Sequence, residues 1–318
     1  MASPALRTAL TTSIERIVAS FTARLPEEEA AVVGKRCARG QLVVSTHEAL
    51  APQASNEEKE RMLRAAVAIE TLQSFLLVAD DVMDESETRR GDVCWHRMPG
   101  IGLSAVNDAI LLHVAAGEEL REAMRGHPAS EPIASTFNAA LNRTLVGQML
   151  DSASARKPEK FGWQRYEEIV TNKTSYYSFV LPLQIGMLGA QVYTGISEVA
   201  QDDRLDVYGN AAVTGKIGSD IREGKCTWFA CRALQLLEKS KDAPTRDRFM
   251  SLYSTPSPTA ESVREVLGIY DKLRLQEDFT RFEQRYSDKL KADIREGTSE
   301  GLRPVLEDIV DKSLSRVK

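Results

Sequence analysis

The chain has 318 residues, 42% of them hydrophobic and 27% charged, which is the composition of a soluble globular protein with a substantial core. A net charge of -5 and the lack of any basic, aromatic-interleaved stretch argue against a nucleic-acid partner. No apolar run approaches the roughly 18 residues of a membrane span, and the four cysteines and four histidines show no zinc spacing, so we expect a cytoplasmic protein with reduced thiols.

The first 25 residues contain three arginines and one acidic residue among many Ser, Thr and Ala residues. This composition also fits a mitochondrial presequence, so mitochondrial targeting stays open. However, the apolar residues from Ala5 to Phe21 keep helical spacing. We therefore favour a structural first helix over a removable leader.

Helical periodicity runs through nearly the whole chain, and no stretch shows the alternation that is typical of a β-strand. Turn residues such as Met98–Gly100 and Thr255–Pro258 separate the segments, and none of the breaks is long enough to be a linker. We predict one all-α domain over 1–318, a helical bundle of about ten to twelve helices around a central active-site cavity. The predicted helices cover 5–24, 27–50, 56–84, 103–125, 131–152, 163–175, 177–208, 214–238, 244–254, 259–271, 275–297 and 302–316.

The helix predicted over 56–84 ends in the motif Asp80–Asp84, which has the form D-D-x-x-D. Its first and last aspartates lie about one turn apart on one helix face. Like charges at this spacing destabilise a helix, and the preceding apolar run Phe75–Ala79 should be buried, so the motif indicates a bound cation. Mg²⁺ fits best, because it binds through one or two carboxylates together with water and substrate phosphates.

A second motif of the same form, Asp202–Asp206, lies in the helix predicted over 177–208. Basic residues follow both motifs: Thr88–Gly91 contains two arginines, and Lys216 and Lys225 come after the second. One such motif would fit an acidic surface patch equally well. Two motifs with basic residues nearby favour a metal-bound diphosphate, because Arg and Lys can bind the oxygens that the metals leave.

These blocks resemble the trans-isoprenyl diphosphate synthases, and among them most closely the eukaryotic farnesyl diphosphate synthases. The resemblance covers roughly residues 34 to 290, and several blocks in the family's order make it more specific than either motif alone. The matching blocks are Phe75–Asp84, Thr88–Gly91 with Cys94 and Trp95, Gly147–Asp151, Lys173–Phe179 and Gly215–Trp228.

The resemblance implies a head-to-tail prenyltransferase that condenses isopentenyl diphosphate with dimethylallyl or geranyl diphosphate. The product would be mainly farnesyl diphosphate, with some geranylgeranyl diphosphate, and we expect a homodimer. Three Mg²⁺ would be held by Asp80, Asp84 and Asp202, with Asp81, Asp203 and Asp206 in support.

By the same resemblance, Lys173 and Thr174 would lie beside the developing allylic cation and share the catalytic role with Asp80 and Asp202. The other implied ligands are basic or amide side chains that hold the two diphosphates. Arg89, Lys173, Lys216 and Lys225 would bind the allylic diphosphate, and Arg36, Arg39, Arg90 and Gln73 that of isopentenyl diphosphate.

Product length would depend on Phe75 and Leu76, which stand five and four positions before Asp80. On a helix they lie about 6–7.5 Å from it along the axis, where the resemblance places the floor of the chain cavity. Phe75 is bulky enough to stop growth at fifteen carbons. The alternative is that both residues are ordinary core.

Three departures weaken parts of the resemblance. Arg36 stands where the family usually has lysine and Lys35 where it usually has glycine, and phosphate binding could survive because Arg can hold a phosphate as well as Lys can. Only 29 positions separate Lys173 from Asp202, roughly a dozen fewer than usual, which predicts a shortened helical hairpin or an exon missing from the gene as read. The segment Ser197–Gln201 also lacks the family's aromatic and glutamine residues, and Arg204 replaces a tyrosine.

Two other functions remain open. A class I terpene synthase would also ionise an allylic diphosphate, but its second metal motif normally combines Asn or Asp with Ser or Thr and Glu. A non-catalytic or weakened regulatory subunit of the same fold would explain the shortened segment. Such subunits usually lose aspartates, whereas this chain has all six.

Overall fold

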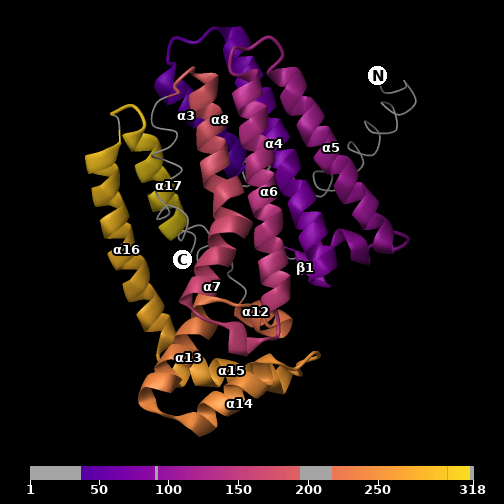
Figure 1. Cartoon of the computed structure of the whole chain (residues 1–318), viewed down its shortest axis with the longest axis vertical. Helices are drawn as coiled ribbons and strands as arrows, with labels where there is room; N and C mark the ends of the chain where they lie inside the picture. Colours follow the sequence, from indigo (N-terminus) through magenta and orange to yellow (C-terminus); the bar gives the residue numbers. More distant parts are fainter. Residues whose placement is uncertain (1–36, 90–91, 194–216, 299, 316–318) are drawn as a thin grey trace. The chain divides into compact units, whose positions relative to one another are not determined.

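A computed structural model describes residues 37–89, 92–193, 217–298 and 300–315 (Figure 1). The prediction of an all-α fold is confirmed, because helices dominate these ranges and the strands within them form one hairpin of two residues each. The helix predicted over 5–24 lies outside the described residues. Of the helix predicted over 27–50, the described part forms α3.

The chain divides into two compact units, and the boundaries fall within α6 and α8. The first unit contains the described residues up to Phe137 and from Pro182 to 193, and the second contains the others. The single domain expected over 1–318 stays a prediction.

The elements of the first unit are α3 (Ala38–Leu50), α4 (Asn56–Met83), β1 (Thr88–Arg89), β2 (Asp92–Val93), η2 (Trp95–Arg97), η3 (Gly102–Ser104), α5 (Ala105–Ala123), the start of α6 (Ser130–Ser154) and most of α8 (Leu181–Gly189). The second unit contains the rest of α6, η4 (Pro158–Lys160), α7 (Trp163–Ile169), the π-helix η5 (Val170–Val180), α12 (Ile217–Glu223), α13 (Trp228–Ser240), α14 (Ala243–Tyr253), α15 (Ala260–Lys272), α16 (Leu275–Gly297) and α17 (Arg303–Ser315).

Helix α4 begins with a capping box. The Ser55 hydroxyl accepts a hydrogen bond from the Glu58 backbone N–H, and the Glu58 carboxylate accepts one from the Ser55 N–H, at 3.2 and 2.7 Å. Two N–H groups that the first turn leaves without a helical partner are thereby satisfied. This cap fixes the start of the helix whose other end carries the first aspartate motif.

Helix α4 packs against α3 and α5, and α4 and α5 lie side by side in Figure 1. Ile69 and Leu72 of α4 are fully buried, and each contributes about 2 kcal/mol through its burial. The contact between α3 and α4 also includes a charged residue. The Glu70 carboxylate of α4 accepts a hydrogen bond from the Gly40 N–H of α3 at 2.7 Å. The packing fixes the direction in which α4 presents its last turn.

Helix α4 is also the described helix that is long and apolar enough to cross a membrane by length and composition. This finding differs from the expectation that no stretch approaches a span. The difference arises because Arg64 and Glu70 interrupt any continuous apolar run while the average stays apolar. The core helix of a globular protein passes the same test, and α4 buries apolar residues such as Ile69, whereas Leu63 and Val67 are exposed.

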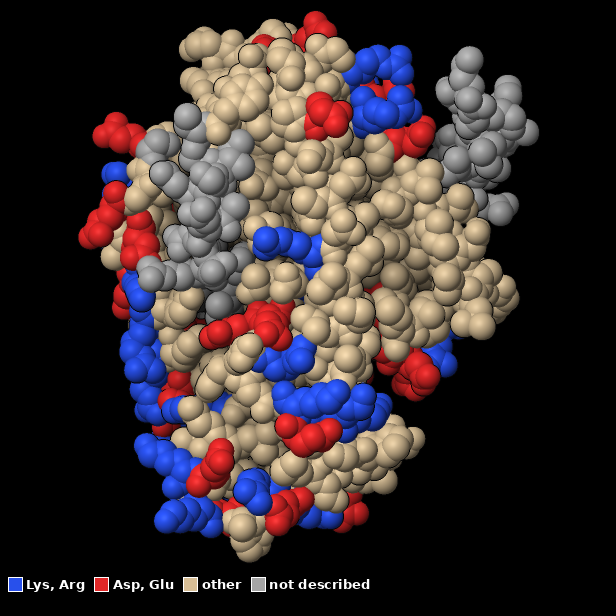
Figure 2. Space-filling model, in the orientation of Figure 1, with Lys and Arg blue, Asp and Glu red and all other residues tan. Residues whose placement is uncertain are grey.

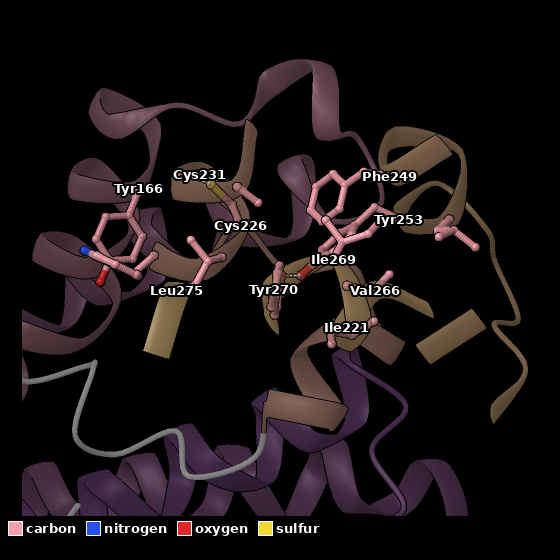
Figure 3. Packing of buried hydrophobic residues seen from close by; sticks show 14 of the residues in the cluster. Tyr166, Ile221, Cys226, Cys231, Phe249, Tyr253, Val266, Ile269, Tyr270 and Leu275 are labelled. Carbon is pink, nitrogen blue, oxygen red and sulfur yellow. Dashed lines mark hydrogen bonds between the residues drawn. The ribbon is translucent and has the colours of Figure 1, made fainter. Parts of the chain in front are cut away.

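The core of the second unit is rich in aromatic residues (Figure 3). Residues from α7 to α16 converge there, and the hydroxyl groups of Tyr253 and Tyr270 lie 2.6 Å apart in a hydrogen bond. Trp228 stacks edge-on against Trp163 and Phe279, with ring centroids 6.1 and 5.0 Å apart. Such aromatic pairs add about 0.5–1.5 kcal/mol each to the stabilisation from apolar burial. The aromatic core therefore stabilises the second unit.

The chain is helical without a break from Trp163 to Gly189, so the break predicted between 175 and 177 is wrong. Its middle section, η5, is a π-helix, in which the Ser175 hydroxyl donates to the Val170 carbonyl at 3.2 Å. Hydrogen bonds in a π-helix span five residues, and such turns occur often at functional sites. Sequence periodicity did not reveal the π-helix, because η5 changes the helical repeat only locally.

The single helix predicted over 214–238 is also wrong, because it is interrupted between α12 and α13. Gly224 has φ +67° there, and the N–H groups of Lys225 and Gly224 donate to the carbonyls of Asp220 and Ile221 at 2.9 and 3.2 Å. This is a Schellman ending, in which glycine adopts the left-handed conformation at least cost. The turn directs the chain at Lys225 away from the helix axis.

Helix α8 ends in the same way. The N–H groups of Val192 and Gln191 donate to the carbonyls of Met187 and Leu188 at 2.9 and 3.0 Å, and Gln191 has φ +57°. The helix predicted over 177–208 therefore stops at Gly189, and the remainder of that prediction beyond 193 lies outside the described residues.

Candidate active site

The first aspartate motif forms the last turn of α4. Asp80 and Asp81 belong to the helix, and Asp84 caps it with its backbone N–H donating to the Asp80 carbonyl at 2.8 Å. No basic residue lies in this last turn, so the negative end of the helix dipole adds to the carboxylate charge. This arrangement favours a cation at the end of α4.

Arg89 provides a positive charge at this place. From the hairpin that follows α4, its Nε donates to Asp81 Oδ1 at 2.8 Å and its Nη2 to Asp80 Oδ2 at 3.0 Å. Burial alone would lower the pKa of Arg89, but its bonds to the two carboxylates outweigh burial and raise this pKa. The sequence predicted an anion ligand in Arg89, and the structure places it on the motif itself.

The donor set at the end of α4 suits Mg²⁺, because carboxylate oxygens are hard ligands of the kind this ion prefers. The binding of Arg89 to two of these carboxylates also indicates a position that needs positive charge. Among the described residues, no group of three His, Cys, Asp or Glu residues could by itself hold a metal ion.

Two predicted ligands of isopentenyl diphosphate are described in the first unit. Gln73 of α4 is 6% exposed, and its Oε1 has no hydrogen-bond partner within the described residues. Arg39 lies in the first turn of α3 and is half-buried. Both stay predictions in their binding role.

The predicted floor residues Phe75 and Leu76 are half-buried in α4. Phe75 packs against the cluster of Val78, Ala105, Ala109 and Leu112. Its ring centroid lies 5.3 Å from that of His113 in α5, a residue that sequence reasoning did not select. Phe75 therefore lies at the contact between α4 and α5, and its role as a floor stays a prediction.

Two predicted lysines are described in the second unit. Lys173 of η5 and Lys225 of the turn after α12 both donate to Asp151 Oδ2 of α6, at 2.6 and 2.9 Å. The side chains of Asp151 and Lys225 are 5% and 9% exposed, and that of Lys173 is 20% exposed. The structure thus brings together two predicted diphosphate ligands on one buried oxygen, and Thr174 follows Lys173 in η5.

Burial would raise the pKa of Asp151, but the two lysine charges and their hydrogen bonds outweigh burial and lower this pKa. Asp220 behaves in the opposite way: burial and the charge of Glu223 raise the pKa of Asp220 to about 7. Sequence reasoning placed Asp151 in a family block without a role. Its partners stand 22 and 74 positions away, a distance that no local pattern bridges.

The other predicted site residues lie outside the described residues. They are Arg36, Arg90, Lys216, Asp202, Asp203 and Asp206, whose roles stay predictions.

The chain is similar to known proteins over most of its length. The family model described as polyprenyl synthetase matches residues 26–270. A farnesyl pyrophosphate synthase of Zea mays is 34% identical over 306 residues, covering 90% of this chain and 86% of the relative. One of Rattus norvegicus is 34% identical over 293 residues, covering 83% and 79%.

Among solved structures, a T. brucei farnesyl diphosphate synthase complexed with the bisphosphonate BPH-722 has a TM-score of 0.82 at 24% identity. The match covers 100% of this chain and 93% of that one, which confirms the fold.

The Zea mays alignment also bears on the predicted shortening. The alignment has 306 positions but includes only 90% of the 318 residues of this chain, which is about 286. About 20 positions are therefore occupied only in the relative, which has residues that this chain lacks. The predicted resemblance is confirmed by the family match over most of the chain and by the identity of its relatives. The chain belongs to the polyprenyl synthetase family.

Proposed function

We propose that the chain is a farnesyl diphosphate synthase that joins isopentenyl diphosphate head-to-tail to dimethylallyl diphosphate and then to geranyl diphosphate. The observation that carries this proposal is the 34% identity to farnesyl pyrophosphate synthases over most of both chains. The acidic end of α4 and the paired lysines on Asp151 support it, because they supply the chemistry that ionisation of an allylic diphosphate requires.

In the proposed reaction, positive side chains hold the diphosphate while the bond between carbon and oxygen breaks. Lys173 and Lys225 are suited to this task because their charges are nearly shielded from water, where electrostatic attraction is strong. Thr174 can present an oxygen to the developing cation. Mg²⁺ bound at Asp80 and Asp84, three ions per site with the second motif, would neutralise the leaving diphosphate.

The side chains of α4 would control the second substrate and the product. Gln73 can donate an amide N–H to the diphosphate of isopentenyl diphosphate. A flip of the side-chain amide exchanges its oxygen and nitrogen, so the NH₂ group can take the position of Oε1. Apolar residues such as Phe75 keep water away from the allylic cation, and Phe75 also limits the chain to fifteen carbons in the main product.

The function is tested by incubating the purified chain with isopentenyl diphosphate, each allylic diphosphate in turn and Mg²⁺, and then sizing the dephosphorylated products. We expect farnesol as the main product, with some geranylgeraniol. Hydrocarbon formed from an allylic diphosphate alone would indicate a terpene synthase. A folded protein that leaves every substrate unchanged would indicate a non-catalytic subunit.

We also propose a homodimer. Four apolar side chains, at positions 103, 106, 110 and 114, recur at helical spacing on one face of η3 and α5 and are 45–81% exposed. The surface over α5 is mostly without charge in Figure 2. A contiguous apolar face of this kind marks a protein interface. A cytoplasmic location stays a prediction, because residues 1–36 lie outside the described residues.

A further inference from the structure

Helix α6 touches the backbone of η5 at Gly147. A Cβ atom at this position would lie 2.1 Å from the Lys173 nitrogen and 2.5 Å from both the Asn172 carbonyl carbon and the Lys173 Cα. All three atoms belong to the main chain, so no side-chain rotation can relieve the clash. Only glycine permits this approach, and the contact falls on a residue predicted to bind the allylic diphosphate.

The same helix holds the other end of Lys173. Asp151 follows Gly147 by four residues, about one turn of α6, and therefore lies on the same face. Its Oδ2 accepts the 2.6 Å hydrogen bond from Lys173 Nζ. One turn of α6 thus fixes Lys173 both at its backbone and at its ammonium group.

Asp151 also sets the position of Lys225. The two ammonium groups share one carboxylate oxygen, so the carboxylate fixes their separation. Two ammonium groups held close together in this way suit the binding of an anion such as a diphosphate.

We propose that Gly147 and Asp151 are positioning residues, which place Lys173, Thr174 and Lys225 for the allylic diphosphate. This inference rests on the proposed function and adds to it two residues that act through the lysines. Neither residue needs to touch the substrate. Their role predicts an effect on the allylic substrate that is separate from any effect on isopentenyl diphosphate.

The experiment compares Gly147→Ala and Asp151→Asn with the wild-type chain. Asp151→Asn has nearly the same shape but lacks the charge. Gly268→Ala is the matched control, because Gly268 lies in α15 of the same unit with a negative φ, and an added Cβ would meet no described atom within 4 Å. Circular dichroism and thermal melting verify the fold of each variant.

We expect both variants to raise the KM for geranyl diphosphate at least tenfold and to lower kcat at least tenfold, while the KM for isopentenyl diphosphate stays within twofold. A merely structural role would reduce the amount of active enzyme and leave both KM values unchanged. Gly268→Ala should match the wild type. If Gly147→Ala does not fold, the KM and kcat values of Asp151→Asn test the proposal alone. If Asp151→Asn also fails to fold, Asp151 is needed for stability and the proposal is overturned.

Calorimetric titration with inorganic diphosphate and Mg²⁺ separates this inference from the proposed function. We expect at least tenfold weaker binding to Asp151→Asn than to the wild type, even if the wild type forms no farnesyl diphosphate. Equal diphosphate affinity and an unchanged KM for geranyl diphosphate in Asp151→Asn would overturn the positioning role, whatever product the wild type makes.

Discussion

Single residues at the end of α4 show how negative charge collects at the first aspartate motif. Arg89 binds the carboxylates of Asp80 and Asp81 where they would otherwise repel each other and the negative end of the helix dipole. The sequence revealed both the aspartates and Arg89. It did not reveal that they bind each other, because a hairpin with strands of two residues gives no recognisable alternation.

We predict that activity requires Mg²⁺ and that Asp80→Ala or Asp202→Ala lowers kcat by a factor on the order of 10²–10³, with the helical fold retained. The reason is that the carboxylates act through metal ions on charge that develops only as the carbon–oxygen bond breaks. Rates at saturating substrate and circular dichroism provide the measurement. Glu131→Ala, which removes an exposed carboxylate at the start of α6, is the control. A rate near that of the wild type in either aspartate variant would exclude a catalytic role for Mg²⁺ bound at these aspartates.

Asp220 predicts a dependence of stability on pH. Its pKa is about 7 in the folded chain against an ordinary value of 3.8, so the folded state binds more protons between these values. Stability contributed by the protonated group is present at low pH and is lost as the pH rises from about 4 to about 7, by at most about 4 kcal/mol. Urea unfolding without Mg²⁺ measures the free energy of unfolding at each pH. In the wild type this free energy should fall between about pH 4 and pH 7, and in Asp220→Asn this fall should be absent. Parallel pH profiles of the variant and the wild type would contradict the assignment.

At the scale of elements, helix positions were the most predictable feature. The segment predicted over 56–84 forms Asn56–Met83, and that predicted over 275–297 forms Leu275–Gly297. Hydrophobic spacing and end signals specify such helices locally. The π-helix and the Schellman ending at Gly224 were missed, because each depends on packing or on a backbone conformation that a periodicity does not encode.

The contact between α4 and α5 carries the prediction of product length. Phe75 packs against the small residues Ala105 and Ala109, and its removal would open space along α4. We expect Phe75→Ala to shift the main product from farnesyl to geranylgeranyl diphosphate or longer, because about one aromatic ring of volume becomes available to the chain. Gas chromatography of the dephosphorylated products measures the change. Phe282→Ala, in the second unit's core, is the control, and an unchanged product in Phe75→Ala would place the floor elsewhere.

At the scale of the whole molecule, the homodimer is the first question. Ile110 is 52% exposed at the middle of the apolar face of α5. We expect Ile110→Glu to weaken the dimer at least tenfold, because an unpaired carboxylate would be buried at its interface. Sedimentation over a range of concentrations measures the dissociation. Glu131→Lys, an exposed change at the start of α6, should leave the dimer intact, and a wild-type chain that sediments as a monomer would refute the proposal.

The last prediction concerns the segment between η5 and the second aspartate motif. Helix α8 stops at Gly189 with a Schellman ending, so twelve residues, 190–201, lead to Asp202. The Zea mays relative has residues that this chain lacks, and we expect the difference to fall in this segment. A shortened hairpin would remove buried apolar area, at about 25 cal/mol per Å², from beside the predicted second metal motif.

We therefore expect a chimera whose segment 190–201 is replaced by the corresponding segment of the Zea mays relative to melt at a higher temperature and to turn over faster than the original chain. The control exchanges the loop at Thr255–Pro258 of the second unit, which should change neither property. Sequencing of the transcript decides the origin: an additional dozen or so residues there would show that the gene as read has lost an exon. A chimera no more stable and no faster than the original would show that the short segment is sufficient for stability and turnover.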